Sequence, residues 1–215
     1  MKINEPQIQN VTEAGPIMKQ ILKLQEGELT AKNLIFSTEF LSDENLSGID
    51  YEYTVFENCR FFQCNFDKVG FINVKFQNCD LSSCSFENAY FNQVEFISCK
   101  GVGSKFQGST MKHVLIQDSN FSFANFEHSK LEKVILSSSD FTSACMAEVK
   151  WKALELKEVN FSSCDFFKTS LKGIDLRGAK IEGIVISDTY QELKGTIVDL
   201  YQAAELAKFL GIIIK

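Results

Sequence analysis

Residues Cys79–Phe96 read CDLSSCSFENAYFNQVEF, and every fifth side chain in this stretch, beginning with Leu81, is apolar. The same frame of five extends from Leu34 to Asp188 and gives 31 block centres, of which 15 are Phe and only Gly101 lacks an apolar side chain. A period of five fits neither the 3.6-residue turn of an amphipathic helix nor the two-residue alternation of a strand. The sequence therefore predicts an internal repeat.

The cysteines of this stretch, Cys79 and Cys84, have two possible roles, as half of a metal site or as a structural part of the repeat. Six of the seven cysteines stand two residues before a block centre, a position that Val, Ala or Ser occupies in other blocks. A metal site needs thiolate ligands, which Val and Ala cannot replace. We therefore interpret these cysteines as small apolar side chains, and we expect no metal ligands and no cofactor. Cys145 stands directly before a centre, is predicted to face solvent and is the candidate reactive thiol.

The composition is that of a folded protein. Of the 215 residues, 45% are hydrophobic and 23% are charged, which excludes the disordered, collagen-like and coiled-coil classes. The sequence has no apolar run long enough to span a membrane. The first ten residues lack the apolar core of a signal peptide, so we expect a cytoplasmic protein with reduced thiols. A net charge of −6 argues against direct binding to nucleic acid or to an anionic membrane.

Motifs typical of catalysis are not found in the sequence. The chain has two histidines, His113 and His128, each two residues after a block centre, and a third partner is not evident for either. The sequence contains neither a glycine-rich phosphate loop nor a nucleophile elbow. We therefore expect no enzymatic activity and no catalytic residue.

The block pattern resembles that of the pentapeptide-repeat family, in which a small residue, Asp or Asn, Leu or Phe, a polar residue and often Gly follow one another. Blocks that match closely include CDLSS, CNFDK, ANFEH, SDFTS, VNFSS and IDLRG. The resemblance implies an all-β fold, a right-handed quadrilateral β-helix with four blocks to a coil and the block centres pointing inward. Phe56, Phe76 and Phe96 then stack in one column at about 4.8 Å, and about 7.75 coils give a rod about 37 Å long.

Both ends of this rod are expected to be capped, because an open coil exposes backbone donors and apolar rings. We expect residues 1–33 to form an N-terminal cap, with a short helix in residues 16–24. Residues 34–188 are predicted to form the β-helix, with an irregular first coil, and residues 189–215 a C-terminal helix and a dimerisation tail.

The C-terminal helix has clear start and stop signals. Asp199 followed by Gln202 forms a capping-box-like start, and Gly211 is a natural stop, so the sequence predicts a helix from about Leu200 to Leu210. Three isoleucines follow, and each is worth about 1.5 to 3 kcal/mol when it is buried. They pack either on the chain's own helix or on a second copy of the chain.

The ending AAELAKFLGIIIK and the blocks TSLKG and IDLRG resemble the quinolone-resistance group of pentapeptide-repeat proteins. The resemblance implies a homodimer that is joined through the C-terminal ends. The residues expected in this interface are Leu200, Leu206, Phe209, Leu210, Ile212, Ile213 and Ile214.

Charged residues can be sorted by the side of the predicted coil on which they recur. We name the four faces after the inner columns that contain Phe56, Phe61, Phe66 and Phe71. The first three faces carry six, five and seven acidic residues against three basic residues each, whereas the Phe71 face carries three acidic and six basic residues. The resulting face charges are −3, −2, −4 and +3. The basic residues of the Phe71 face are Lys112, Lys130, Lys133, Lys150, Lys152 and Lys172.

The same resemblance implies a DNA mimic that binds DNA gyrase or topoisomerase IV and modulates its activity or its sensitivity to quinolones. Such a partner would contact acidic residues of two faces. Loops that project from the coils in many drug-protecting relatives are missing from this unbroken frame. The alternative is a β-helical protein-interaction module with a different partner, whose surface charges serve only solubility. The candidate partner-binding residues are Asp67, Glu87, Glu127, Glu148 and Asp165 on the Phe66 face, and Glu95, Asp118, Glu155 and Glu158 on the Phe56 face.

Overall fold

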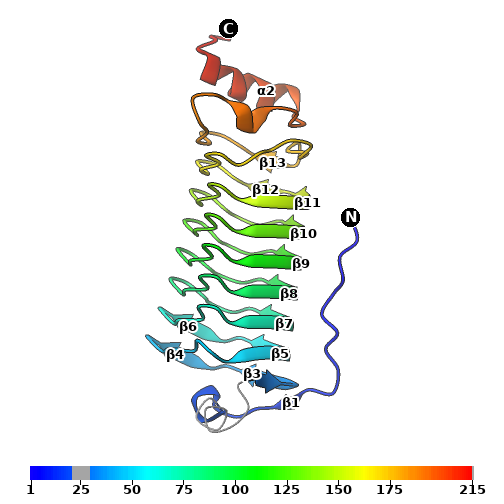
Figure 1. Cartoon of the computed structure of the whole chain (residues 1–215), viewed down its shortest axis with the longest axis vertical. Coiled ribbons are helices and arrows are strands. Elements are labelled where there is room, and N and C mark those ends of the chain that lie inside the picture. The colour runs from blue at the N-terminus through cyan, green and yellow to red at the C-terminus, as the bar shows by residue number, and fades with distance from the viewer. Residues whose placement is uncertain (21–29, 215) are drawn as a thin grey trace.

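Six strands of eight residues make up most of the nine-stranded parallel sheet that the described residues form (Figure 1). In the computed structural model, which describes residues 1–20 and 30–214, each strand pairs in register with the strand one coil later, so that Phe56 lies beside Phe76 and Phe76 beside Phe96. Residues of the same block position therefore recur every 20 residues, as the period predicts. These strands are β5 (Asp50–Glu57), β7 (Gly70–Gln77), β8 (Tyr90–Ile97), β9 (Thr110–Gln117), β10 (Lys130–Ser137) and β11 (Lys150–Lys157).

Shorter strands complete the coils at the two ends. In the N-terminal part, β1 pairs with β3, β2 and β3 pair with β5, and β4 pairs with β6. Towards the C-terminus, β12 pairs with β13. Their bounds are β1 Thr12–Glu13, β2 Thr30–Lys32, β3 Leu34–Ser37, β4 Phe40–Ser42, β6 Arg60–Phe62, β12 Val159–Asn160 and β13 Ala179–Lys180.

The chain turns a corner two residues after every block centre. Each corner from Thr38 to Gly173 has a positive φ, for example 54° at Asn73, so the corners adopt the left-handed conformation. The long strands bend at such a corner and cover parts of the Phe71 and Phe56 faces, whereas tight turns and isolated bridges build the Phe61 and Phe66 faces. The predicted quadrilateral β-helix with a C-terminal helix is thus confirmed.

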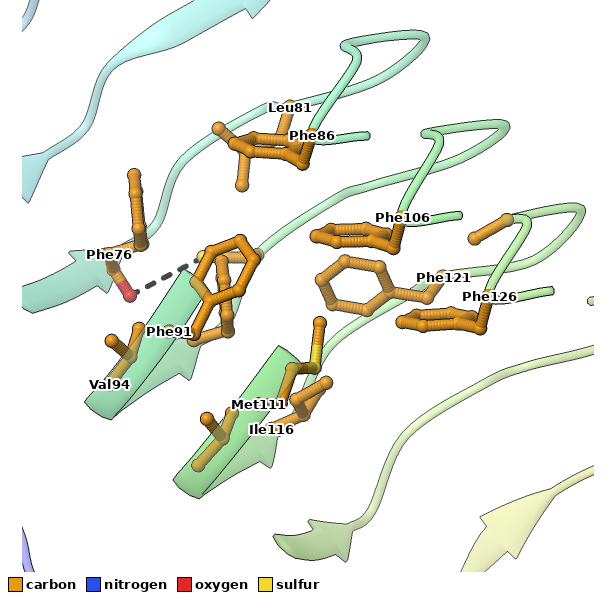
Figure 2. Close-up of a cluster of buried hydrophobic side chains, with 14 of the residues drawn as sticks. Phe76, Leu81, Phe86, Phe91, Val94, Phe106, Met111, Ile116, Phe121 and Phe126 are labelled. Carbon is orange, nitrogen blue, oxygen red and sulfur yellow. Dashed lines mark hydrogen bonds between the residues drawn. The ribbon is translucent and has the colours of Figure 1, made fainter. Parts of the chain in front are cut away.

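Stacked aromatic rings fill the interior (Figure 2). Phe86 stacks between Phe66 and Phe106, with ring centroids 5.0 and 4.9 Å apart and ring planes within 4° of parallel. Every block centre from Phe36 to Met146 is buried. At Gly101 an added Cβ would lie 2.4 Å from the ring of Phe121, so this ring occupies the space that a side chain would fill. The interior therefore stays filled at Gly101, the one block centre that lacks an apolar side chain.

Six cysteines are buried beside these rings, and Cys145 is half-buried. The thiol of Cys84 donates to the carbonyl of Phe61 at 3.1 Å, and the hydroxyl of Thr169 donates in the same way to Met146 at 2.6 Å. Burial raises the pKa of the Cys164 thiol to about 12, so this cysteine stays protonated at neutral pH. The buried cysteines thus serve as small side chains, and all of them except Cys64 donate to a carbonyl of the coil before them.

We expect Cys84→Ala to lower the free energy of unfolding by only about 1 kcal/mol, because it removes one weak hydrogen bond and little volume. Alanine already occupies the equivalent positions at Ala124 and Ala144. Chemical denaturation of the variant, with and without a chelator and a reductant, measures this effect. A metal or disulfide role would instead appear as a large loss of stability in the variant or after either treatment.

The N-terminal segment before β1 runs alongside the rod (Figure 1). Its backbone donates from Gln7 to the side chain of Asn73 at 2.9 Å and from Asn4 to Nδ1 of His113 at 3.0 Å. Further on, the α-amino group of Met1 contacts the carboxylate of Glu155. These partners lie at or near the edge between the Phe71 and Phe56 faces, so the segment covers part of that edge. Residues 17–20 are helical, Pro16 is not, and residues 21–24 of the predicted short helix lie outside the described residues.

The C-terminal end is closed by α2 (Leu200–Ala207), which is followed by the 3-10 turn η2 (Lys208–Leu210). The predicted capping box is present between Asp199 and Gln202, and Gly211 ends the helix with a φ of 71°. The buried amide of Gln202 also donates to the carbonyls of Leu176 and Ala179 at 2.6 and 2.7 Å. The side chain of Gln202 thus caps the start of α2 and also provides hydrogen-bond donors for two backbone carbonyls of the last coil. None of the described helices is long and apolar enough to span a membrane.

Glu192, in the 3-10 turn η1 (Gln191–Leu193), is a buried carboxylate at this end of the rod. It accepts hydrogen bonds from the backbone of Lys168 at 2.8 Å and from the hydroxyl of Ser187 at 2.8 Å. Burial raises the pKa of Glu192, but these hydrogen bonds outweigh it, and the net result is a lowered pKa.

The lowered pKa predicts that ionised Glu192 stabilises the fold above the pKa of an unfolded glutamate, about 4.3, and that this contribution disappears as the pH falls through the lower folded value. Glu192→Gln should therefore cost about 1 to 3 kcal/mol at neutral pH and less in acid. Denaturation of both proteins across the acidic range measures the difference. An equal loss at every pH would contradict the assigned role of the charge.

Candidate protein-interaction surface

The acidic side chains of the Phe66 face follow one another along the rod. Asp67, Glu87 and Glu127 occupy the same block position, one after a centre, in the first, second and fourth of four successive coils, whereas Glu148 lies at a corner. All of these side chains, and Asp165, are half-buried and reach solvent. Asp67 also accepts a hydrogen bond from the backbone of Glu87 at 2.9 Å. The structure therefore brings the five predicted residues of this face onto one side.

Lys168 partly neutralises the C-terminal half of this face. Glu148 lies 3.5 Å from Lys168 and 3.5 Å from His128, and His128 lies 3.8 Å from Glu127. Exposed pairs of this kind contribute little to stability. The positive charge of Lys168 instead reduces the negative field around Glu148. Lys68 and Lys105 are also exposed on this face, so its row of carboxylates is interrupted by positive charge.

The predicted residues of the Phe56 face fall into two groups. Asp118 and Glu158 are exposed and line one open groove of about 620 Å³ at the border with the Phe61 face, together with Asp140. Glu95 and Glu155 are instead only 14% and 24% exposed, and they pair with Lys75 at 3.6 Å and Lys157 at 2.9 Å. The structure thus places only Asp118 and Glu158 where a partner has free access.

The Phe71 face combines lysines with the single tryptophan. Lys130, Lys150, Lys152 and Lys172 are exposed on it, and Lys152 pairs with Glu132 at 3.4 Å. Trp151 is half-buried, although it occupies a block centre. The basic character predicted for this face is therefore concentrated around β11.

An apolar surface lies at the C-terminal end. Leu200, Ile213 and Leu210 are 82%, 83% and 65% exposed, and Ile212 and Ile214 are also exposed. Leu206 and Phe209 instead pack against the core of the chain. Tyr201, which sequence reasoning did not select, is 83% exposed beside Leu200. The predicted interface residues thus divide into an exposed group and a pair that holds α2 on the coil.

The remaining reactive groups form no common centre. His113 contacts the N-terminal segment and His128 contacts acidic residues. Burial raises the pKa of the half-buried Cys145 thiol, which lowers its reactivity. Within the described ranges, no cluster of three or more His, Cys, Asp or Glu side chains is arranged to hold a metal ion. The features of this surface that a partner could recognise are its charged side chains and its exposed apolar side chains.

Comparisons with solved structures give three examples of similar proteins. A trypsin-treated variant of QnrB1, a plasmid-mediated fluoroquinolone resistance protein, is 25% identical, with 86% of this chain and 90% of that chain covered and a TM-score of 0.40. HetL, a pentapeptide repeat protein involved in heterocyst differentiation regulation in the cyanobacterium Nostoc, is 11% identical, with 87% and 95% covered and a TM-score of 0.43. A pentapeptide repeat protein of the Arabidopsis thaliana thylakoid lumen is 17% identical, with 53% and 67% covered and a TM-score of 0.32. A comparison with curated protein sequences gives no significant match.

Two family models match the coils directly. The model described as a pentapeptide repeat region matches residues 50–126, and the model described as pentapeptide repeats in eight copies matches residues 119–150 and 154–183. Together they span more than half of the chain and coincide with the regular part of the β-helix. By its sequence and its fold, the chain belongs to the pentapeptide-repeat family.

Proposed function

We propose that this protein binds a type II topoisomerase, DNA gyrase or topoisomerase IV, as a partial mimic of duplex DNA in the cytoplasm. It would thereby modulate the activity of the enzyme or its sensitivity to quinolones. The observation that carries the proposal is the acidic side of the rod, where carboxylates recur along an uninterrupted ladder of coils. A surface that binds phosphates responds to the summed field of such a row more than to any single contact.

The charge density limits how closely the rod can imitate DNA. Duplex DNA carries one charge per about 1.7 Å of its axis, whereas successive coils of a β-helix are about 4.8 Å apart. Asp67 and Glu87 lie one coil apart, and Glu87 and Glu127 lie two coils apart. The rod should therefore compete with DNA at low salt and lose its affinity as salt screens the field.

The experiment that tests this function is a supercoiling assay with purified gyrase, with and without a quinolone. Our proposal predicts slower supercoiling in a molar excess of the protein, and an effect that weakens as salt is added. Unchanged supercoiling at a large excess would reject it.

The alternative function, an interaction module with another partner, is favoured by the lysine-rich surface around β11.

We also propose that the protein is a homodimer joined through its C-terminal ends, because five apolar side chains of the predicted interface are exposed there.

Changing Leu200 and Ile213 together to Glu should give monomers, since two charges would have to be buried in the interface. Light scattering should give twice 24.3 kDa for the wild-type chain and 24.3 kDa for this variant. Phe123→Glu, at an exposed position on the Phe61 face, serves as the control and should stay dimeric. A monomeric wild-type protein at micromolar concentration would rule the dimer out.

A further inference from the structure

The long parallel sheet has an open edge at β11. In the part of the chain that the structure describes, β11 pairs with β10 but with no strand or bridge on its other side. The next coil instead pairs with the last turn of the chain, where Leu171 donates to Glu192 and Leu176 donates to Ile197, both at 2.8 Å. The backbone of β11 that points towards the C-terminus is therefore not part of a ladder.

The side chain of Trp151 takes the place of one ladder bond at this edge. In a regular coil the backbone N–H of a block centre donates to the next coil, as Phe61 does to Asp80 at 2.7 Å. At Trp151 the acceptor at the equivalent position, the carbonyl of Ser170, receives the indole Nε1–H instead, also at 2.7 Å. The indole thus replaces the backbone group of its own residue. Trp151 and Leu156, the two centres of β11, are the first block centres along the chain that are not buried.

Two cavities flank this edge, and together we call them the β11 cleft. One has a volume of about 440 Å³ and is lined by residues that include Lys150, Trp151, Lys168 and Lys172. The other also has about 440 Å³ and is lined by residues that include Glu155, Leu156, Asp175 and Arg177. Both are lined by Leu154, so they lie next to each other along the strand. The open edge is therefore accompanied by space along much of its length.

The β11 cleft offers backbone groups and positive charge. By the pattern of the other coils, the N–H groups of Trp151 and Leu156 and the carbonyls of Val149 and Leu154 point into it. Among the described residues, Lys150 and Lys172 have no carboxylate within ion-pair distance, whereas Lys168 pairs with Glu148 at 3.5 Å. Unpaired strand edges add a further strand readily, and lysines beside the edge favour a negatively charged one.

We propose that the β11 cleft binds an extended acidic peptide segment of a partner protein, which adds to β11 as a parallel or antiparallel strand. Backbone hydrogen bonds to the open edge hold the segment, and its carboxylates pair with Lys150 and Lys172. Strand addition of this kind takes affinity from main-chain bonds and specificity from alternate side chains. The lysine-lined part of the cleft lies mainly on the basic Phe71 face, whereas Glu155 and Asp175 line its other part on the Phe56 face. The peptide test uses no topoisomerase, so its outcome is separate from that proposal.

The test uses the full chain and a fluorescein-labelled octapeptide of alternating Glu and Val. Trp151 is the only tryptophan in the sequence, so its emission reports occupancy of the β11 cleft directly. We expect a saturable change in tryptophan emission that parallels the rise in peptide anisotropy. Changing Lys150 and Lys172 together to Glu should weaken binding at least about tenfold, which is about 1.4 kcal/mol. Lys68 and Lys105, both exposed on the Phe66 face, provide the matched double control, which should bind as the wild type does.

Two further measurements separate an added strand from simple charge attraction. The same octapeptide with N-methyl groups on alternate residues keeps its charge but loses backbone donors, and it should bind at least about tenfold more weakly. Short duplex DNA should not displace the octapeptide. Equal binding of the methylated peptide, displacement by DNA, or no change in tryptophan emission would each overturn the proposal.

Discussion

Phe86→Ala is expected to lower the free energy of unfolding by about 3 to 5 kcal/mol. Phe86 is fully buried and stacks on Phe66 and Phe106, while Phe71 and Phe91 lie beside it with centroids about 6 Å away. The surrounding side chains belong to a ladder whose coils are held by backbone hydrogen bonds, so they cannot collapse into the space left by the ring. Chemical denaturation followed by circular dichroism measures the loss.

Phe123→Ala is the matched control, because Phe123 is 64% exposed and packs against no column of rings. It should change the stability by less than about 0.5 kcal/mol. A similar loss in both variants would show that the inner columns do not carry the stability of the rod.

The second large effect is expected when Glu87, Glu127 and Glu148 are changed together to Lys. If the acidic face competes with DNA for a topoisomerase, this reversal should weaken inhibition of supercoiling at least about a hundredfold, because a cationic face is repelled where an anionic one is attracted. The melting temperature should change little, since these carboxylates reach solvent and exposed ion pairs contribute little to stability. Titration of the variant and the wild type in the supercoiling assay gives the comparison.

A second triple variant, with Asp50, Glu52 and Glu132 of the Phe71 face changed to Lys, controls for net charge. It makes the same change in charge but lies outside the Phe56 and Phe66 faces. Reversal of Lys130, Lys133, Lys150 and Lys152 to Glu should have the opposite effect and strengthen inhibition, because it extends the acidic surface. Equal losses in the two triple variants would mean that total charge, and not the acidic face, governs binding.

The repeat made most of the fold predictable. One five-residue block determines the inward centre, the small residue before it and the corner after it, so a period found in the sequence becomes a column in space. The structure confirms the columns of Phe56, Phe76 and Phe96 and the C-terminal helix with its Asp199 and Gln202 box. These features depend on local geometry that every coil repeats.

Features that break the repeat were not predictable in the same way. The N-terminal segment is held by single contacts between distant residues, such as Asn4 and His113, and no periodic signal marks them. Trp151 fits the pattern of apolar centres, yet its half-buried indole donates to the carbonyl of Ser170, and among the described residues no strand continues the ladder beyond β11. Glu95 and Glu155 were predicted from face charge alone, which does not reveal that nearby lysines and the N-terminal segment cover them.

The central claim, that the acidic side of the rod takes the place of DNA on a topoisomerase, is tested most directly by displacement of DNA from gyrase. A labelled DNA duplex is bound to purified gyrase, and its fluorescence anisotropy is followed while the protein is added at two salt concentrations. The proposal predicts that the protein releases the duplex. When the same fraction of gyrase carries DNA at the start, a higher concentration of the protein should be needed for release at the higher salt concentration. If the duplex stays bound at a large excess of the protein, or if the protein and the duplex occupy gyrase together, the proposed mimicry is wrong.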